Sequence, residues 1–577
     1  MDTMMGGARY RQTGTAPKTS STSADMTITH PLIYFIAELL RSAALGMTLL
    51  FFGSLVIISD PLQSILDTQL SLKPGALLHR LWLLPPLDVY INVYMFNYTN
   101  VDEFTSGRAS KLQVQEVGPY VYKEVLSNHN VTYNESNNTI TYSPKREYVF
   151  APERSVGDPK IDRIRAPNIP LMGVTTLASS LSMFAALGLS AITRQLNSQP
   201  MLEMSVHDYM WGYEDHLVEL ASRFVPNWID FSSFGIMEKL FREGNESNVF
   251  NMNLPEPKDK YGMRMTDAPR GYTVDSINGE RGFKGWQYNE ETNGTMCNRI
   301  WGSHDATLFP LDMDENDEFF LYRRTFCRRL PVKFNRTTTY NGLDAFEFVM
   351  EPDSFDSEVD NANSSCYCKN NRCLKKGVGN VSPCYYNIPL AITYPHFMHA
   401  DPSLLEPFDG LQPNESRFTS TFVVQPQLGA PMQGTHLRLQ ANQVVGKVNF
   451  NRMMTPFENM ILPLLWVDLN IDVLCLSLRL LIHGIKWGFP LLQWSAALGM
   501  LLAGVYQLCS ALLLCFWPTA KQFQKVDQVE RGTAVQVIGV GLGLATGLRK
   551  PSVHLDPEEQ HHLLLGGGSF IPKMAKT

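Results

Sequence analysis

The sequence predicts an α+β membrane protein in which two helices flank one large domain. One uncharged run, residues 42–59, is about eighteen residues long and approaches the ~20 residues that a helix needs to cross a bilayer. A second uncharged run, residues 488–518, has Trp494 and Trp517 toward its ends, where interfacial aromatic residues belong. The region between these runs alternates like β-strands on both sides of a helical stretch.

The two apolar runs divide the chain into five parts. We expect a cytosolic tail at residues 1–31, a transmembrane helix at 32–59, an ectodomain at 60–487, a second transmembrane helix at 488–518 and a cytosolic tail at 519–577. The first helix is interpreted as a retained anchor rather than a cleaved signal, because a long polar segment precedes it and no small-residue cleavage site follows its apolar run.

Glycosylation motifs predict that the middle region lies outside the cytosol. All ten Asn-x-Ser/Thr sequons lie between the apolar runs, and neither tail contains one. Both tails carry more basic than acidic residues although the whole chain has a formal net charge of −7, in line with the positive-inside tendency. We therefore expect both termini in the cytosol and N-glycosylation at Asn97, Asn130, Asn134, Asn137, Asn245, Asn293, Asn335, Asn363, Asn380 and Asn414.

The periodicity of the ectodomain changes along the chain. From Trp82 to Phe150 apolar and polar residues alternate, as in half-buried strands. Residues 171–196 and 204–224 repeat at intervals of three and four, as helices do, and strand-like runs return after residue 225. No linker or internal repeat divides the region, so we expect one α+β domain in which early and late strands share a sheet.

Cysteine usage agrees with an oxidising compartment. An even number of cysteines between the apolar runs favours a disulfide framework over a zinc site, although six cysteines allow fifteen pairings that spacing alone cannot separate. Cys509 and Cys515 lie inside the second apolar run near its cytosolic end, where they are either packing residues or sites of S-palmitoylation. The six ectodomain cysteines are Cys297, Cys327, Cys366, Cys368, Cys373 and Cys384.

Several longer motifs, in a fixed order from about residue 82 to 468, carry a resemblance to a known family. They read VYMFNYTNVDEFTSG, EVGPYVYKE, APERSVGDP, PNIP, MWGYED, WGSHDATLFP, YPHFMHADP, DGLQPNES and LPLLWVDL. With the two terminal anchors and the cysteine pattern, the chain resembles the class B scavenger receptor family, which includes a fatty-acid translocase and a lysosomal integral membrane protein. Its long tails depart from the short ones usual in that family, and we expect an invertebrate-type member.

The resemblance implies a fold and a set of disulfides. The implied ectodomain is an antiparallel β-barrel-like core with an internal apolar tunnel, and a helical bundle at about residues 171–224 forms its apex. Ligand contacts the bundle, and lipid such as fatty acid, sterol, carotenoid or lipoprotein lipid passes down the tunnel. The implied disulfides are Cys297–Cys366, Cys327–Cys384 and Cys368–Cys373.

The helical apex supplies candidate ligand contacts, each with a plainer alternative. Leu177, Leu181 and Phe184 are either core residues or part of an apolar binding surface. Family members that bind oxidised lipoprotein are thought to use apical lysines, whereas these two helices offer only arginines, among them Arg194, so binding of polyanions here is in doubt. His207 and His216 are either ordinary surface histidines or pH-sensitive contacts with a protein cargo.

The C-terminal tail contains a candidate sorting motif. Glu559 stands four residues before Leu563 and Leu564, which is the acidic dileucine pattern read by clathrin adaptors. Such a motif predicts cycling through endosomes or residence in lysosomes. The apolar stretch 533–548 is too short to span a bilayer comfortably and is assigned to the tail or to the membrane interface.

Enzymatic and nucleic-acid functions lack support in the sequence. It contains no His-Glu-x-x-His motif, nucleophile elbow or P-loop, and the pair His304 and Asp305 is assigned a structural role. We expect no enzyme activity, no cofactor, no metal and no nucleic-acid partner. Two hypotheses remain beside a plain adhesion role: a receptor at the plasma membrane or in endosomes that passes lipid toward the membrane, and an endosomal or lysosomal receptor that sorts a lumenal protein.

Overall fold

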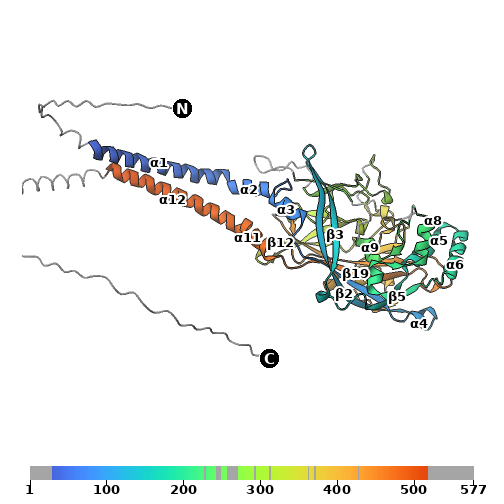
Figure 1. The fold of residues 1–577 in the computed structure, drawn as a ribbon. Coiled ribbons are helices and arrows are strands. Elements are labelled where there is room, and N and C mark those ends of the chain that lie inside the picture. The colour runs from blue at the N-terminus through green and yellow to red at the C-terminus, as the bar shows by residue number, and fades with distance from the viewer. Residues whose placement is uncertain are drawn as a thin grey trace, which may run out of the picture. The chain divides into compact units, whose positions relative to one another are not determined.

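The computed structural model describes residues 29–516, except 227–228, 242–247, 256–270, 292–293, 296, 311–312, 362, 369–371 and 427. The chain divides into two compact units. One comprises Met1–Leu55 with Ala496–Thr577, and the other comprises Val56–Ser495. Each unit is described in turn, and Figure 1 shows the course of the chain.

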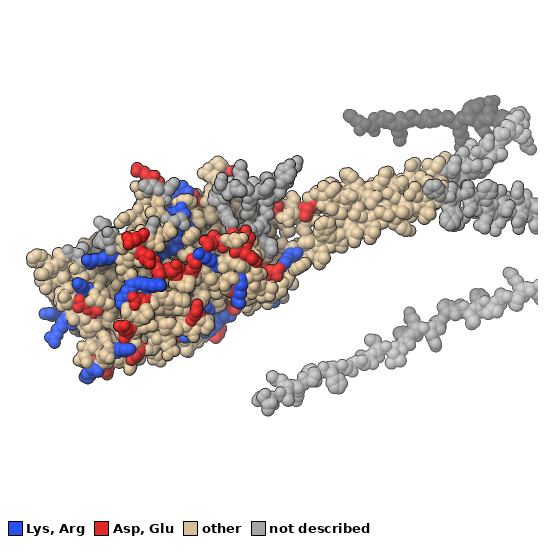
Figure 2. All heavy atoms as spheres, turned by 180° about the vertical axis from the view of Figure 1, so that it is seen from behind, with Lys and Arg blue, Asp and Glu red and all other residues tan. Residues whose placement is uncertain are grey.

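The first unit contains the greater part of two long apolar helices, α1 (Thr29–Ser59) and α12 (Phe489–Phe516). A Cβ on Gly46 would come within 2.9 Å of Leu508, and one on Gly504 within 2.9 Å of Leu50, so these glycines permit the close approach of the two backbones. Ser42 Oγ donates to Gln507 Oε1 at 2.7 Å. The surface of the helix pair is almost free of charged residues (Figure 2).

Within the described residues, two helical segments are long and apolar enough to cross a membrane, Ile33–Ser59 and Leu476–Cys515. The second is longer than the expected span 488–518, because α11 (Leu476–His483) and a π-helical turn (Gly484–Gly488) lead into α12. Lys486 forms an ion pair with Asp344, and His483 Nε2 lies 3.1 Å from the carbonyl oxygen of Asn341. These two contacts attach the added turns to the ectodomain.

The ectodomain is built around one large sheet, 15-stranded among the described residues, whose neighbours run β10-β11-β12-β16-β18-β19-β1-β2-β3-β8-β9. The first and last of the long strands are adjacent, with Val93 opposite Val467, so early and late strands share the sheet as expected. The strands of this path are β1 (Val89–Tyr98), β2 (Leu112–Asn134), β3 (Thr139–Phe150), β8 (Phe250–Asn253), β9 (Thr273–Ile277), β10 (Glu318–Tyr322), β11 (Arg329–Tyr340), β12 (Leu343–Met350), β16 (Thr421–Gln425), β18 (His436–Val444) and β19 (Ile461–Ile471).

Shorter elements complete the ectodomain. Four strands join the sheet at its sides and four more form two small ribbons. The strands are β13 (Gly379–Asn380), β14 (Leu390–Thr393), β15 (Phe408–Asp409), β17 (Ala430–Pro431), β4 (Arg163–Pro167), β5 (Met201–Ser205), β6 (Tyr213–Glu214) and β7 (Ser233–Phe234). The helices are α2 (Pro61–Gln69), α3 (Leu77–Leu83), α4 (Val101–Thr105), α5 (Ile169–Leu181), α6 (Met183–Gln195), α7 (Val206–Trp211), α8 (His216–Phe224), α9 (Ile236–Phe241) and α10 (Glu415–Phe418).

A two-residue bridge closes the sheet into a barrel-like ring. Ser303 pairs with Val274 on β9, and His304 pairs with Leu321 on β10, so this short segment joins the two edge strands. His304 is buried with Nδ1 3.0 Å from the Tyr272 carbonyl oxygen, and Asp305 accepts a hydrogen bond from Tyr142 at 2.8 Å. These contacts support the structural role assigned to His304 and Asp305.

The helical region differs from expectation, because each of the two expected helices is interrupted. The run 171–196 breaks at Ser182, which is extended (φ −161°, ψ 160°) and caps α6 by accepting from the Ala185 N–H at 3.1 Å. The run 204–224 breaks at Gly212, whose φ of 144° ends α7, and Asp215 then caps α8. The periodicity identified helical segments correctly but missed the caps that separate them.

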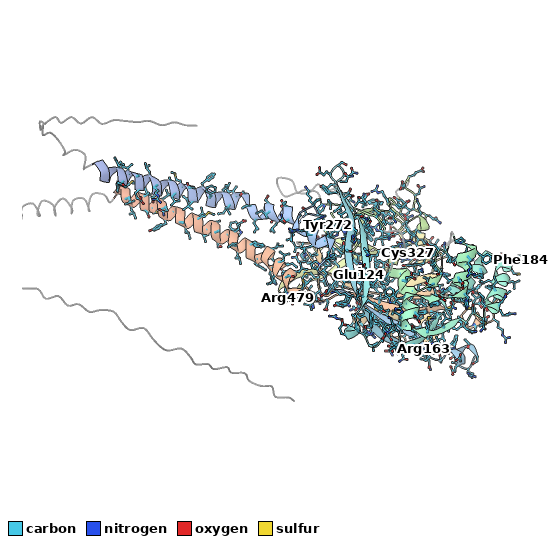
Figure 3. All side chains as sticks on the ribbon, in the orientation of Figure 1. Glu124, Arg163, Phe184, Tyr272, Cys327 and Arg479 are labelled. Atoms are coloured by element: carbon cyan, nitrogen blue, oxygen red, sulfur yellow. A yellow bond between two sulfur atoms is a disulfide. The ribbon has the colours of Figure 1, made fainter. Side chains whose placement is uncertain are left out.

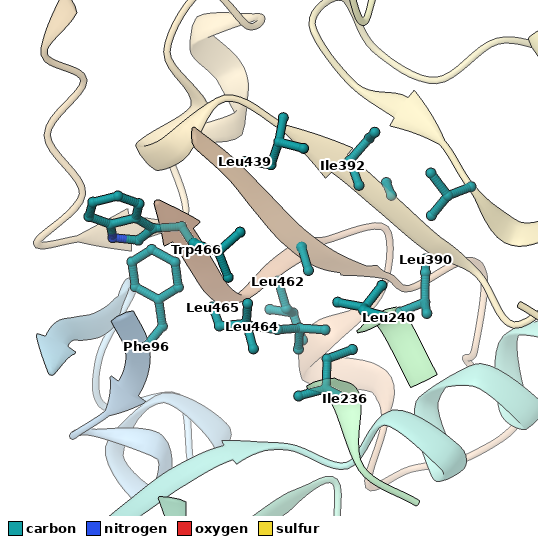
Figure 4. Packing of buried hydrophobic residues seen from close by; sticks show 14 of the residues in the cluster. Phe96, Ile236, Leu240, Leu390, Ile392, Leu439, Leu462, Leu464, Leu465 and Trp466 are labelled. Carbon is teal, nitrogen blue, oxygen red and sulfur yellow. The ribbon is translucent and has the colours of Figure 1, made fainter. Parts of the chain in front are cut away.

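Apolar packing and three disulfides hold the described ectodomain together. Figure 4 shows the core where α9 brings Ile236 and Leu240 toward residues of β14 and β19. The disulfides Cys297–Cys366, Cys327–Cys384 and Cys368–Cys373 have Cα–Cα distances of 6.3, 5.8 and 4.3 Å, and they are the pairs that the family resemblance implies. The first two close loops of 69 and 57 residues, which predicts roughly 4 kcal/mol of stabilisation each in the chain-entropy treatment.

Candidate functional site

One concave feature of the described ectodomain is a cavity of about 390 Å³ lined by residues of β1, β2, β10, β16, β18 and β19 and of the loops beside them. Most of its walls are apolar. Its lining includes Leu84, Pro85, Pro86, Leu87, Asp88, Val89, Lys123, Glu124, Val125, Leu126, Ala306, Thr307, Phe309, Leu321, Tyr322, Arg323, Phe326, Phe422, Pro431, Thr435, Leu437, Leu469 and Ile471. Its volume lies within the ~300–1,000 Å³ typical of pockets that hold small ligands.

A second, much smaller cavity of about 30 Å³ continues along the same wall. It is lined by Leu240 on α9, by Ile392 on β14 and by residues of β18 and β19. The two cavities share four lining residues, so they are neighbours, and we call them the larger and the smaller lobe and the shared residues the junction. The junction residues are Arg323, Phe326, Leu437 and Leu469.

An apolar stripe on β18 and β19 forms the wall common to both lobes. Successive same-face positions on β18 are Leu437, Leu439 and Ala441, and the register sets them opposite Leu469, Val467 and Leu465 of β19. Because side chains alternate between the faces of a strand, these six residues point to one side of the sheet. The alternation THLRLQA signals the β18 half of this stripe in the sequence, but sequence reasoning did not identify these residues as a site.

One end of the larger lobe lies where α11 docks on the ectodomain. The lining residue Leu87 packs against a buried cluster that includes Ile482 of α11, and the Cys475 sulfur lies 3.7 Å from the Pro86 carbonyl oxygen. The chain continues from α11 into α12, one of the two long apolar helices. This end of the cavity therefore lies beside the segment that leads into α12.

The cavity wall contains two groups of charged residues. Lys123 Nζ and Asp88 Oδ1 form an ion pair at 2.5 Å, and both side chains are substantially exposed. Deeper in the wall, Arg146 Nε donates to Glu124 Oε1 at 3.0 Å, and Arg323 Nη2 lies 3.7 Å from the same oxygen. The Glu124 side chain is only 3% exposed, so this second group is a buried ionic cluster in an otherwise apolar space.

A different polar cluster holds four of the family motifs together. Glu116 accepts hydrogen bonds from Arg417 at 2.5 Å, from His396 Nε2 at 2.8 Å and from the Trp466 indole N–H at 2.9 Å. His396 Nδ1 accepts from the Gln412 N–H at 3.0 Å, so Nε2 carries the proton that Glu116 accepts. Burial raises the pKa of the Glu116 carboxyl, but the three hydrogen bonds outweigh it and bring the pKa down to about 2.

The apex candidates do not form one site. Phe184 (88% exposed) and Arg194 lie on α6, with Met183 and Leu187 also exposed, at the end of the ectodomain opposite Arg479 of α11 (Figure 3). Leu177 on α5 is half-buried, and the side chain of Leu181 lies outside those described.

The two candidate histidines lie on two other helices of the region 171–224. His207 on α7 is half-buried, with Nδ1 3.5 Å from Asp208 Oδ1. His216 on α8 is exposed, with Nδ1 3.8 Å from Glu219 Oε2. Both histidines therefore face acidic neighbours rather than each other.

The remaining candidates are scattered over the chain. Cys509 and Cys515 are free and exposed on α12. Glu559, Leu563 and Leu564, the stretch 533–548, Asn245 and Asn293 lie outside the described residues. Asn97 and Asn380 are half-buried, whereas Asn130, Asn134, Asn137, Asn335, Asn363 and Asn414 are exposed. Within the part of the chain that is described, no group of three or more His, Cys, Asp and Glu could hold a metal ion.

Comparison with known proteins places these features in context. The CD36 family model matches residues 44–515. Scavenger receptor class B member 1 of Sus scrofa is 30% identical over 429 residues, which cover 73% of this chain and 78% of that protein. Lysosome membrane protein 2 of Mus musculus is 29% identical over 404 residues, covering 70% of this chain and 79% of that protein.

Proposed function

The chain belongs to the CD36 family, as its motifs predict, and from this we propose that it is a class B scavenger receptor. It binds lipid or lipoprotein at the cell surface or in endosomes and passes lipid toward the membrane through the ectodomain. The observation that carries the proposal is the two-lobed apolar cavity, whose larger lobe is about 390 Å³ and ends beside α11. The matching class B scavenger receptors support the same reading.

The physical basis of the transfer is removal of apolar surface from water. Each Å² of apolar surface kept dry is worth about 25 cal/mol, so a dry conduit lowers the barrier for a lipid without nucleotide hydrolysis. The smaller lobe, at about 30 Å³, is too narrow for a lipid chain. Passage of a lipid from the apex therefore requires the side chains at the junction to move. The apolar stripe on β18 and β19 then forms the wall along which the lipid chain passes.

The test is a bulky substitution at the junction. Leu469→Trp fills the space shared by both lobes, whereas Val149→Trp adds the same side chain at an exposed position of β3. In cells expressing the full chain, uptake of a fluorescent lipid, normalised to surface protein, should fall severalfold for the first variant and stay unchanged for the second. Equal uptake by Leu469→Trp and the unsubstituted chain would refute the conduit.

A second function is favoured by the exposed apolar residues of α6. Met183, Phe184 and Leu187 are 76%, 88% and 54% exposed, which suits contact with a lumenal protein cargo, and Lysosome membrane protein 2 is among the relatives. In this alternative the chain sorts its cargo to endosomes or lysosomes through clathrin adaptors that bind the tail. Leu563→Ala with Leu564→Ala should then leave receptor and cargo at the cell surface, and unchanged surface levels would argue against sorting by this motif.

A further inference from the structure

Arg323 lines the cavity with a guanidinium whose hydrogen-bond donors are not used by any described residue. It follows β10 and lines both lobes at the junction. Its side chain is 17% exposed, and its nearest charged partner is Glu124, with Nη2 to Oε1 at 3.7 Å. Its guanidinium makes no hydrogen bond within the described structure, and Nε is buried without a partner. A guanidinium carries five N–H donors, so nearly all of its bonding capacity is unused.

The neighbouring charges do not complete the bonding of Arg323. Glu124 Oε1 already accepts from Arg146 at 3.0 Å, and Glu124 Oε2 is buried without a hydrogen-bond partner in the described part of the chain, so in this arrangement neither oxygen accepts a hydrogen bond from Arg323. The other ion pair of the wall, Lys123 with Asp88, is satisfied within itself at 2.5 Å. Lys123 and Arg323 are the only lysine and arginine among the described lining residues, and of these two only Arg323 is not held in a short ion pair.

A buried cation without hydrogen bonds is costly, and a bound acceptor removes much of that cost. Planar guanidinium groups bind carboxylates with two parallel hydrogen bonds, which neutral esters and hydrocarbons cannot reproduce. We propose that Arg323 is the specificity-determining residue of the cavity and selects lipids with a single acidic head group. The head lies at the junction against Arg323, and the hydrocarbon chain lies along the apolar walls.

This inference rests on the proposed function, since it requires lipid to enter the cavity. The experiment compares equilibrium binding of radiolabelled palmitate and methyl palmitate, which differ only in the head, to the full chain purified in detergent. The unsubstituted chain should bind palmitate roughly 10-fold to 100-fold more tightly than the ester, the range of a charge-assisted hydrogen-bonded pair. Arg323→Met should bring this ratio close to one while ester binding stays unchanged.

Two further variants serve as controls. Arg323→Lys keeps the charge and should retain part of the preference. Lys145→Met removes a positive charge that is paired with Glu147 on β3, outside the lining of either cavity, and should leave the preference intact. The inference is overturned if the unsubstituted chain binds both lipids equally, if Arg323→Met keeps the preference, or if Lys145→Met abolishes it.

The outcome also separates this inference from the proposed function. If neither lipid binds, or if Leu469→Trp leaves binding of both unchanged, the cavity is not a lipid site and the proposed function fails. If Leu469→Trp abolishes binding of both lipids while Arg323→Met alters neither, lipid occupies the cavity without head-group selection. In that case the proposed function stands and only the role of Arg323 is refuted.

Discussion

Two acidic residues of the same strand, the half-buried Glu116 and the buried Glu124 of β2, show how differently a carboxylate inside the fold can be used. Glu116 accepts three hydrogen bonds from three separate segments of the chain. Glu124 receives one short contact from Arg146, and the second arginine beside it, Arg323, stays 3.7 Å away. A fully satisfied network stabilises one arrangement of the fold, whereas an incompletely satisfied one keeps donors available. The first cluster is therefore structural, and the second lies on the wall of the cavity.

The largest effect is expected from removing the satisfied carboxylate. Glu116→Ala leaves the buried donors of His396 and Trp466 without an acceptor, which should lower the free energy of unfolding by about 3 kcal/mol. Thermal unfolding of the full chain measures this, with Glu406→Ala, an exposed carboxylate, as the control. A loss no larger than that of the control would contradict the structural role of the cluster.

The pH dependence of the free energy of unfolding tests the same structural role of Glu116. The pKa of Glu116 is about 2 in the folded chain, below its ordinary value near 4.5, so its stabilisation is complete above pH ~4.5 and is lost as the pH falls toward 2. Since the group is partly solvated, we expect a loss of about 1–3 kcal/mol over that window. Subtracting the profile of Glu116→Gln isolates this contribution, and identical profiles for both proteins would rule it out.

A smaller effect is expected from a single donor. Trp466→Phe removes the indole N–H that donates to Glu116 at 2.9 Å but keeps a ring stacked on Tyr94, whose centroid lies 4.0 Å away. The free energy of unfolding should fall by about 1.5 kcal/mol, the worth of one hydrogen bond to a charged group. In the Glu116→Ala background the same substitution should cost less, and a double-mutant cycle by chemical denaturation measures the coupling. Full additivity would show that the two groups do not interact.

The sequence predicted the parts of this fold that depend on local pattern. Apolar length identified both long helices, and alternation identified the strands of the early and late sheet. Capping signals were also present but not used: Ser182 precedes the α6 run and Asp215 precedes the α8 run, as N-cap residues do. The motif EVGPYVYKE identified the family and contains both Glu116 and Glu124, but a motif does not state which residues meet.

The site itself could not be predicted from one sequence because its geometry is set by register between distant segments. Leu437 reads as an inward residue of an alternating strand, but only the pairing with Leu469 on β19 makes the two a common wall. Arg323 stands beside Arg324 in the sequence, and nothing local distinguishes them. Arg323 becomes distinctive because the fold places it 3.7 Å from Glu124 and at the junction of two lobes.

The smallest effect on stability is expected at Arg323, and it decides whether the two clusters really differ. Arg323 has no hydrogen bond to lose, and its ion pair with Glu124 is long, so Arg323→Met removes a desolvated charge at little cost. We expect the free energy of unfolding to change by less than about 1 kcal/mol, in either direction, in the assay used for Glu116→Ala. Destabilisation as large as that of Glu116→Ala would mean that Arg323 holds the fold together, and the contrast between the two carboxylates would collapse. A small change, together with the loss of preference for an acidic head, would separate the role of Arg323 in binding from any role in folding.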